Sequence, residues 1–126
     1  MTSRRAFTLI ELLIVVVIIG ILAALAVPKF AYTKGHAYTA QMKSDLRNLA
    51  VAQEGYFYQN GSYATTAVVL APSFIPSTGN TLTIVTSSGG GWSARATNSN
   101  TTVTCALFYG VAPLAPATVD GVIACQ

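Results

Sequence analysis

The stretch that decides the fold of this chain is Ala6-Phe7-Thr8-Leu9-Ile10-Glu11, followed by seventeen uncharged residues, LLIVVVIIGILAALAVP, at positions 12–28. A helix rises about 1.5 Å per residue, so this stretch forms a helix close in length to the ~30 Å hydrocarbon core of a bilayer. Glu11 lies within its first turns, where a charge costs about 2.5–3.5 kcal/mol in a membrane. We therefore expect Glu11 to meet a positive partner once the helix leaves the lipid.

Three other interpretations compete with an anchor that also assembles with other chains. An ordinary membrane anchor explains the length, and Arg4 and Arg5 orient its N-terminus toward the cytoplasm, but it leaves Glu11 unexplained. A secretory signal has a shorter apolar region and a small-residue cleavage site, which Ala24-Leu25-Ala26 could supply. A buried core helix is not expected in a chain of 126 residues. The residues favour the assembling anchor and leave the alternatives open.

The segment Phe7-Thr8-Leu9-Ile10-Glu11-Leu12, after a short basic leader, resembles the N-terminus of the type IV pilins and of the related pseudopilins. In that family a prepilin peptidase cuts just before the phenylalanine, and the new amino group is N-methylated. The resemblance implies that residues 1–6 are removed by cleavage between Ala6 and Phe7 and that Phe7 is methylated. It also implies that Glu11 pairs with the Phe7 ammonium of a neighbouring subunit. Ala6 stands where the family usually has glycine.

The function that the resemblance implies is that of a structural subunit of a type IV pilus, which polymerises through its apolar helix into an extracellular filament. The implied partners are further copies, the prepilin peptidase, the pilus assembly machinery of the bacterial inner membrane, and that membrane before assembly. Adhesion, twitching motility and DNA uptake would be roles of the filament. Two alternatives stay open: a pseudopilin of a type II secretion system, and a membrane-anchored or secreted binding domain.

The helix is expected to continue past Pro28 to about Tyr58, with an apolar half over residues 7–28 and an amphipathic half over 29–58. Gly20 and Pro28 both weaken a helix. The resemblance implies that the segment between them loosens when subunits pack, and a static kink is the alternative. An apolar stripe with three- and four-residue spacing runs along the second half: Tyr38, Met42, Leu46, Leu49, Ala52 and Tyr56. Lys43, Asp45, Arg47, Asn48 and Glu54 fall largely elsewhere on the helix.

Residues 59–126 are expected to form a globular β domain with a surface connection before its strands. That connection has a short helical turn near residues 67–70. Alternating patterns predict strands over residues 81–87, 92–97 and 103–109. Three or four antiparallel strands packed on the amphipathic half of the helix make the fold class α+β.

The two cysteines, Cys105 and Cys125, are predicted to form a disulfide, as in many pilins, because chemistry outside the cytoplasmic membrane favours one. The bond would bound a C-terminal loop in a segment without regular structure. A metal site would need more ligands than these and His36, the sole histidine. Asn100, in an Asn-Thr-Thr triplet within a predicted loop, is a candidate glycosylation site.

Charge and composition narrow the function further. Two of the seven basic residues lie in the leader, so five would remain against four acidic residues. Arg95 is the one basic residue outside the helix and its leader, and nucleic-acid binding, which wants clustered Lys and Arg, is not expected. No catalytic triad, acid–base pair, phosphate loop or metal cluster can be assembled from these residues. We therefore expect no enzymatic activity and no cofactor.

Overall fold

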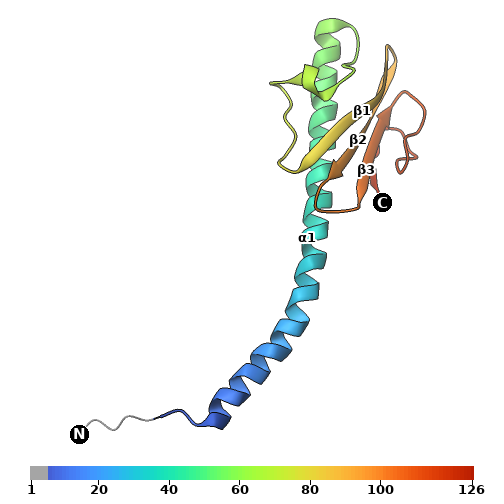
Figure 1. Ribbon diagram of the computed structural model, residues 1–126. Coiled ribbons are helices and arrows are strands. Elements are labelled where there is room, and N and C mark those ends of the chain that lie inside the picture. The colour runs from blue at the N-terminus through green and yellow to red at the C-terminus, as the bar shows by residue number, and fades with distance from the viewer. Residues whose placement is uncertain (1–5) are drawn as a thin grey trace. The chain divides into compact units, whose positions relative to one another are not determined.

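The computed structural model describes residues 6–126 and contains one long helix and a four-stranded sheet (Figure 1). The elements, in chain order, are α1 (Leu9–Asn60), the short 3-10 helix η1 (Ala67–Leu70), β1 (Asn80–Ser88), β2 (Gly91–Asn98), β3 (Thr104–Tyr109) and β4 (Ala124–Cys125). The strands follow one another in the order β1-β2-β3-β4, and all neighbours are antiparallel. The α+β fold class predicted from the sequence is confirmed.

The chain divides into two compact units, Met1–Lys34 and Gly35–Gln126. In the first unit α1 is helical through both Gly20 and Pro28, and every side chain over residues 6–34 is exposed. A window of 18 residues in this helix has a mean hydropathy of 3.1, and none of it is buried. By length and composition the helix can therefore cross a membrane.

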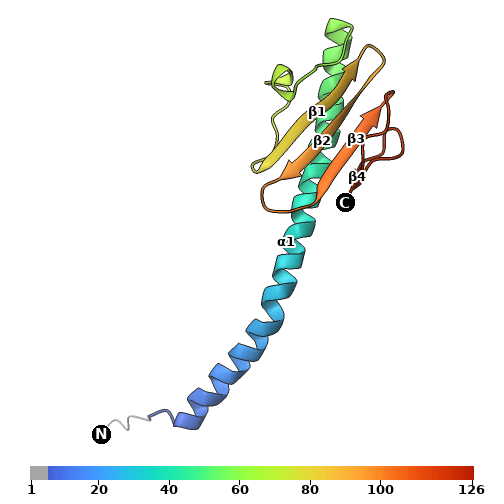
Figure 2. The same cartoon turned by 45° about the vertical axis from the view of Figure 1, so that its right-hand side comes forward.

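In the second unit the sheet lies along α1, as Figure 2 shows. The core consists of side chains from α1 and from one face of the sheet. Met42, Leu46 and Leu49 of α1 are fully buried, as the apolar stripe predicts. Their counterparts on β2 alternate along the strand and are equally buried: Trp92, Ala94 and Ala96. The small alanines suit a helix packed close to the sheet. The ring centroids of Trp92 and Tyr109 lie 5.5 Å apart, so the two aromatic side chains pack against each other.

The C-terminal segment covers the opposite face of β3. Ala106 and Phe108 point away from the helix, yet both are buried, together with Ala117 of the returning chain. The expectation that residues 110–126 lack regular structure is wrong for Ala124–Cys125, which pairs with β3 as β4. The sheet therefore has a main core toward α1 and a smaller one under its last loop.

Asp45 is a correction to the predicted helix face, because the structure buries it to 3% exposure. Its carboxylate accepts hydrogen bonds from the Ser77 N–H at 2.9 Å, the Ser77 hydroxyl at 2.8 Å and the Asn80 side-chain amide at 2.7 Å. Burial of a carboxylate is tolerated where donors surround it. These bonds fasten the connection after η1 to the helix.

Candidate processing and assembly site

The predicted cleavage site, the bond between Ala6 and Phe7, lies outside the helix. Ala6 and Phe7 lie in irregular exposed backbone, and the Phe7 side chain is 85% exposed. The leader residues 1–5, including Arg4 and Arg5, lie outside the described residues. The helix begins at Leu9, two residues later than predicted, because Thr8 acts as its N-cap.

Thr8 and Glu11 close the first turn of α1 by bonding to each other. Glu11 Oε2 accepts hydrogen bonds from the Thr8 backbone N–H at 2.8 Å and from the Thr8 hydroxyl at 2.7 Å. In return the Glu11 N–H donates to Thr8 Oγ1 at 3.3 Å. This is a capping box, in which two residues satisfy backbone donors that the first turn leaves free. Its sequence signature, Thr-x-x-Glu, is a local pattern from which the capping box can be predicted.

The capping box leaves Glu11 able to bind a cation as well. A carboxylate offers about four lone-pair positions, and the two bonds from Thr8 both end on Oε2. The Glu11 carboxylate also lies at the N-terminus of the helix, where the macrodipole favours negative charge. Pairing with the Phe7 ammonium of a neighbour stays a prediction, and the box would hold the carboxylate in place for it.

An extended apolar surface follows Glu11 along the helix. Its large side chains between residues 12 and 27 have exposed fractions from 51% for Ile18 to 70% for Leu25. Contiguous exposed apolar surface of this size is typical of a membrane or protein contact and rare on a soluble monomer. Gly20 lies within it, and a Cβ added there would meet nothing within 4 Å. The predicted loosening between Gly20 and Pro28 stays a prediction.

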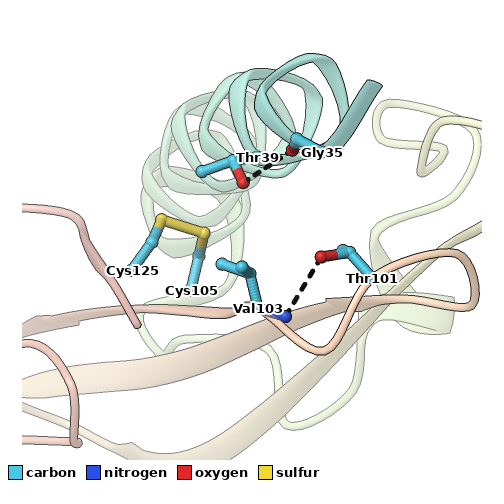
Figure 3. Close-up of a disulfide and its surroundings, with 6 residues drawn as sticks. All are labelled: Gly35, Thr39, Thr101, Val103, Cys105 and Cys125. Atoms are coloured by element: carbon cyan, nitrogen blue, oxygen red, sulfur yellow. Dashed lines mark hydrogen bonds between the residues drawn. A yellow bond between two sulfur atoms is a disulfide. The ribbon is translucent and has the colours of Figure 1, made fainter. Parts of the chain in front are cut away.

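The predicted disulfide is present, and it joins β3 to β4. The Cys105–Cys125 bond has an S–S distance of 1.99 Å, and the two residues are 20 positions apart. Thr104 and Gln126 next to it exchange backbone hydrogen bonds of 2.8 and 3.0 Å. Figure 3 shows the disulfide on the side of the sheet that faces the helix. Cys105 is fully buried. The bond thus fixes the last residues of the structure to the core.

The remaining predicted site residue, Asn100, lies exposed in the turn between β2 and β3. Its backbone N–H donates to Asn98 Oδ1 at 2.8 Å, which shapes that turn. Glycosylation of Asn100 stays a prediction. Over residues 6–126, no three His, Cys, Asp or Glu side chains gather closely enough to hold a metal ion.

The N-terminal segment matches a known protein family. Residues 1–27 match the prokaryotic N-terminal methylation motif. The chain is 42% identical over 77 residues to the type IV major pilin protein PilA of Myxococcus xanthus, which covers 61% of this chain and 34% of the relative. It is 41% identical over 81 residues to the type II secretion system core protein G of Klebsiella pneumoniae, covering 60% and 58%. The chain therefore matches about a third and somewhat over half of the lengths of these two relatives.

A third relative matches over most of both chains. The type IV wide pilus major component PilA4 of Thermus thermophilus is 34% identical over 105 residues, which cover 82% of this chain and 80% of the relative. That alignment reaches beyond α1 into the sheet, so the likeness is not confined to the apolar helix. Together with the methylation motif and the helix-and-sheet fold, it shows that the chain belongs to the type IV pilin-like family.

Proposed function

We propose that the chain is a structural subunit of a type IV pilus, held in the bacterial inner membrane before assembly and then polymerised with further copies into a surface filament. The observation that carries this proposal is the exposed apolar surface of α1, which begins directly after a capped carboxylate. Each Å² of apolar surface removed from water contributes about 25 cal/mol. Lipid covers this surface in the membrane, and the same helix in other copies would cover it in a filament.

The processing steps act on residues just before the capping box. Cleavage by a prepilin peptidase between Ala6 and Phe7, followed by N-methylation of Phe7, would leave an ammonium two residues before Leu9, where α1 starts. In the assembled core this ammonium would bind Glu11 of a neighbour. A buried ion pair gives specificity more reliably than net stability, so the pair would set the axial register of the subunits. Loosening between Gly20 and Pro28 would let the helices pack.

A pseudopilin of a type II secretion system is the second candidate. It is favoured by the likeness to the core protein G, at 41% identity over 81 residues. The pilus subunit is supported by the likeness to the major pilus component of Thermus thermophilus, which extends over 82% of this chain. A pseudopilin would share the N-terminal chemistry and differ in whether surface fibres form.

The test is mass spectrometry of protein sheared from cell surfaces, with electron microscopy of the same fraction. A pilus subunit gives abundant fibres whose chain begins at N-methylated Phe7 and is two mass units light for the Cys105–Cys125 bond. Cleavage at Phe7 without surface fibres would favour the pseudopilin. A chain that begins near Val27, or one that keeps Met1, would contradict both and leave an anchored or secreted binding domain.

A variant pair tests the assembly role of Glu11. Glu11→Gln keeps the shape of the side chain and removes its charge, so we expect it to insert in the membrane and to reduce sheared fibres at least about tenfold. Glu54→Gln removes a charge from an exposed position of the same helix and serves as the control. Equal fibre yields from the two variants would exclude the proposed ion pair.

A further inference from the structure

A group of exposed cationic and aromatic side chains follows the apolar surface in the first unit. It consists of Lys29, Phe30, Tyr32 and Lys34, which we call the interfacial belt. Phe30 is 64% exposed and Tyr32 is 71% exposed. A helix turns about 100° per residue, so these side chains point in several directions around its circumference. A single protein docked on the unassembled subunit would contact one stripe of the helix, whereas the surface of a bilayer surrounds a helix that crosses it.

The distance between the charges at the two ends of the apolar surface fits a bilayer. Glu11 and Lys29 are separated by eighteen helical positions with no charged residue between them. At about 1.5 Å per residue this is about 27 Å along the axis, close to the ~30 Å hydrocarbon thickness. When Glu11 lies at one surface of the hydrocarbon layer, Lys29 therefore lies close to the other, from which its long side chain can reach the lipid phosphates.

Lys34 adds a second ammonium to this group. Its Nζ lies 4.9 Å from the centroid of the Phe30 ring, so the side chain reaches back toward a residue one turn nearer the apolar surface. Helical side chains lean toward the N-terminus, which accounts for this direction. Between Glu11 and Asp45 the sequence has no acidic residue, so no carboxylate of that stretch neutralises the two lysines.

We propose that the interfacial belt binds the phosphate groups of anionic phospholipids on the extracytoplasmic surface of the inner membrane and sets the depth of the subunit before assembly. The inference rests on the proposed function, in which α1 spans that membrane. Two exposed lysines and two aromatic rings directly beyond an apolar span complement an anionic headgroup layer in charge and in polarity. Leader cleavage removes Arg4 and Arg5 from the opposite end, after which these lysines are the nearest cationic side chains to the span.

The experiment uses the full-length chain reconstituted in phosphatidylcholine vesicles that contain spin-labelled phosphatidylglycerol or spin-labelled phosphatidylcholine. Electron spin resonance gives the ratio of the association constants of the two lipids for the protein. We expect a preference for phosphatidylglycerol of up to about fivefold for each lysine at low salt. The double variant K29Q/K34Q should lose most of it, and high salt should suppress it in the unaltered chain.

The matched control is K43Q/R47Q, which removes two cations farther along the same helix, in the second unit. Arg4 and Arg5 are kept in every variant, so their contribution cancels. An unchanged preference in K29Q/K34Q, or an equal loss in K43Q/R47Q, would overturn the inference and leave the proposed function intact. A chain that does not insert into vesicles would overturn both the inference and the membrane step on which it rests.

Discussion

Two polar side chains of α1, Asp45 and Gln53, face the interior of the second unit, and both bind the connection that follows the helix. The Gln53 side-chain amide donates to the Ala64 carbonyl at 3.0 Å, and its oxygen accepts from the Ala64 N–H at 2.8 Å. Asp45 binds the later part of the same connection through Ser77 and Asn80. Much of this connection lies outside regular structure, and the backbone groups of Ala64 and the Ser77 N–H find their hydrogen-bond partners in these two side chains.

Replacing Asp45 by alanine should lower the free energy of unfolding by about 2–4 kcal/mol, because three buried or half-buried donors lose a charged acceptor. Unfolding by denaturant in detergent can be followed through Trp92, the sole tryptophan, which is fully buried. Ser44→Ala, at the exposed neighbouring position, is the control and should change stability little. Equal effects of the two substitutions would contradict the role assigned to Asp45.

Tyr63 should hold its proton to higher pH than an ordinary tyrosine. Desolvation raises the pKa of its hydroxyl, and the hydrogen bond of 3.1 Å to Glu54 and the charge of that carboxylate raise the pKa further. The unfolded group ionises near pH 10, so its contribution to stability is complete below that pH and is lost as pH rises through the folded pKa. The change Glu54→Gln should lower the Tyr63 pKa.

The Tyr63 pKa can be measured as the difference in tyrosinate absorbance between each protein and its Tyr63→Phe counterpart. Subtracting Tyr58→Phe in the same way gives the control, since Tyr58 is 92% exposed. A Tyr63 pKa that does not respond to Glu54→Gln would show that desolvation alone sets it.

Single residues also mark where sequence reasoning stopped short. The charge of Glu11 draws attention to its assembly role, which stays a prediction, whereas its bond to Thr8 follows from the local Thr-x-x-Glu pattern of a capping box. Asp45 is different, because helical periodicity records only whether a residue is apolar. The groups that donate hydrogen bonds to Asp45 belong to Ser77 and Asn80, more than thirty positions away, so no local sequence pattern predicts these bonds.

Among the elements, the hairpin of β1 and β2 ends in three consecutive glycines that are not equivalent. A Cβ added to Gly91 would lie 2.8 Å from the carbonyl carbon of Gly110 and closer still to the carbonyl oxygen of Tyr109. A Cβ at Gly89 would meet nothing within 4 Å. Gly91 therefore allows the end of β3 to approach β2, whereas Gly89 only forms the turn.

The substitution Gly91→Ala should destabilise the protein by about 1–3 kcal/mol, the range for overpacking, because backbone atoms must move to admit the methyl group. Gly89→Ala is the matched control and should stay within about 0.5 kcal/mol of the unaltered chain. The midpoints of thermal unfolding of the unaltered chain and the two variants measure these differences in stability. A smaller loss in Gly91→Ala than in Gly89→Ala would show that the close approach does not constrain the sheet.

Most of the elements could be predicted from sequence, because their patterns are local. The turn at Ala67–Leu70 and the three longer strands lie within a residue or so of their expected bounds. The cover over Ala106 and Phe108 could not be predicted in this way. The alternating pattern of β3 correctly predicts that both side chains point away from the helix. The segment that buries them, residues 110–123, folds back through proline and glycine turns and has no periodic pattern from which its path could be predicted.

At the scale of the whole molecule, the two units differ in what stabilises them. The second unit has its own buried core and a disulfide. In the first, the side chains over residues 6–34 are all exposed, so the cover for its apolar surface must come from outside the described residues of the chain. The candidate assembly site belongs to the first unit, and the expectation that its apolar half needs lipid or other copies followed from sequence alone.

A fragment that comprises Gly35–Gln126 should fold by itself and remain soluble without detergent, because it contains the buried core and lacks the continuous apolar surface of the first unit. We expect a single species in gel filtration and one cooperative unfolding transition reported by Trp92. The full-length chain should need detergent or lipid to give the same result. Aggregation of the fragment, or a gradual loss of Trp92 fluorescence, would show that its core depends on the first 34 residues.

The capping box has a consequence for the proposed processing of the chain. Thr8 and Glu11 both lie downstream of the bond between Ala6 and Phe7, so every side chain that closes the first turn would be kept after cleavage of that bond. The bond itself lies in irregular backbone, the form in which a peptidase can accept a substrate without unwinding a helix. Precursor and mature chain should thus present the same helical start, and maturation would change the charge at that end while leaving its architecture alone.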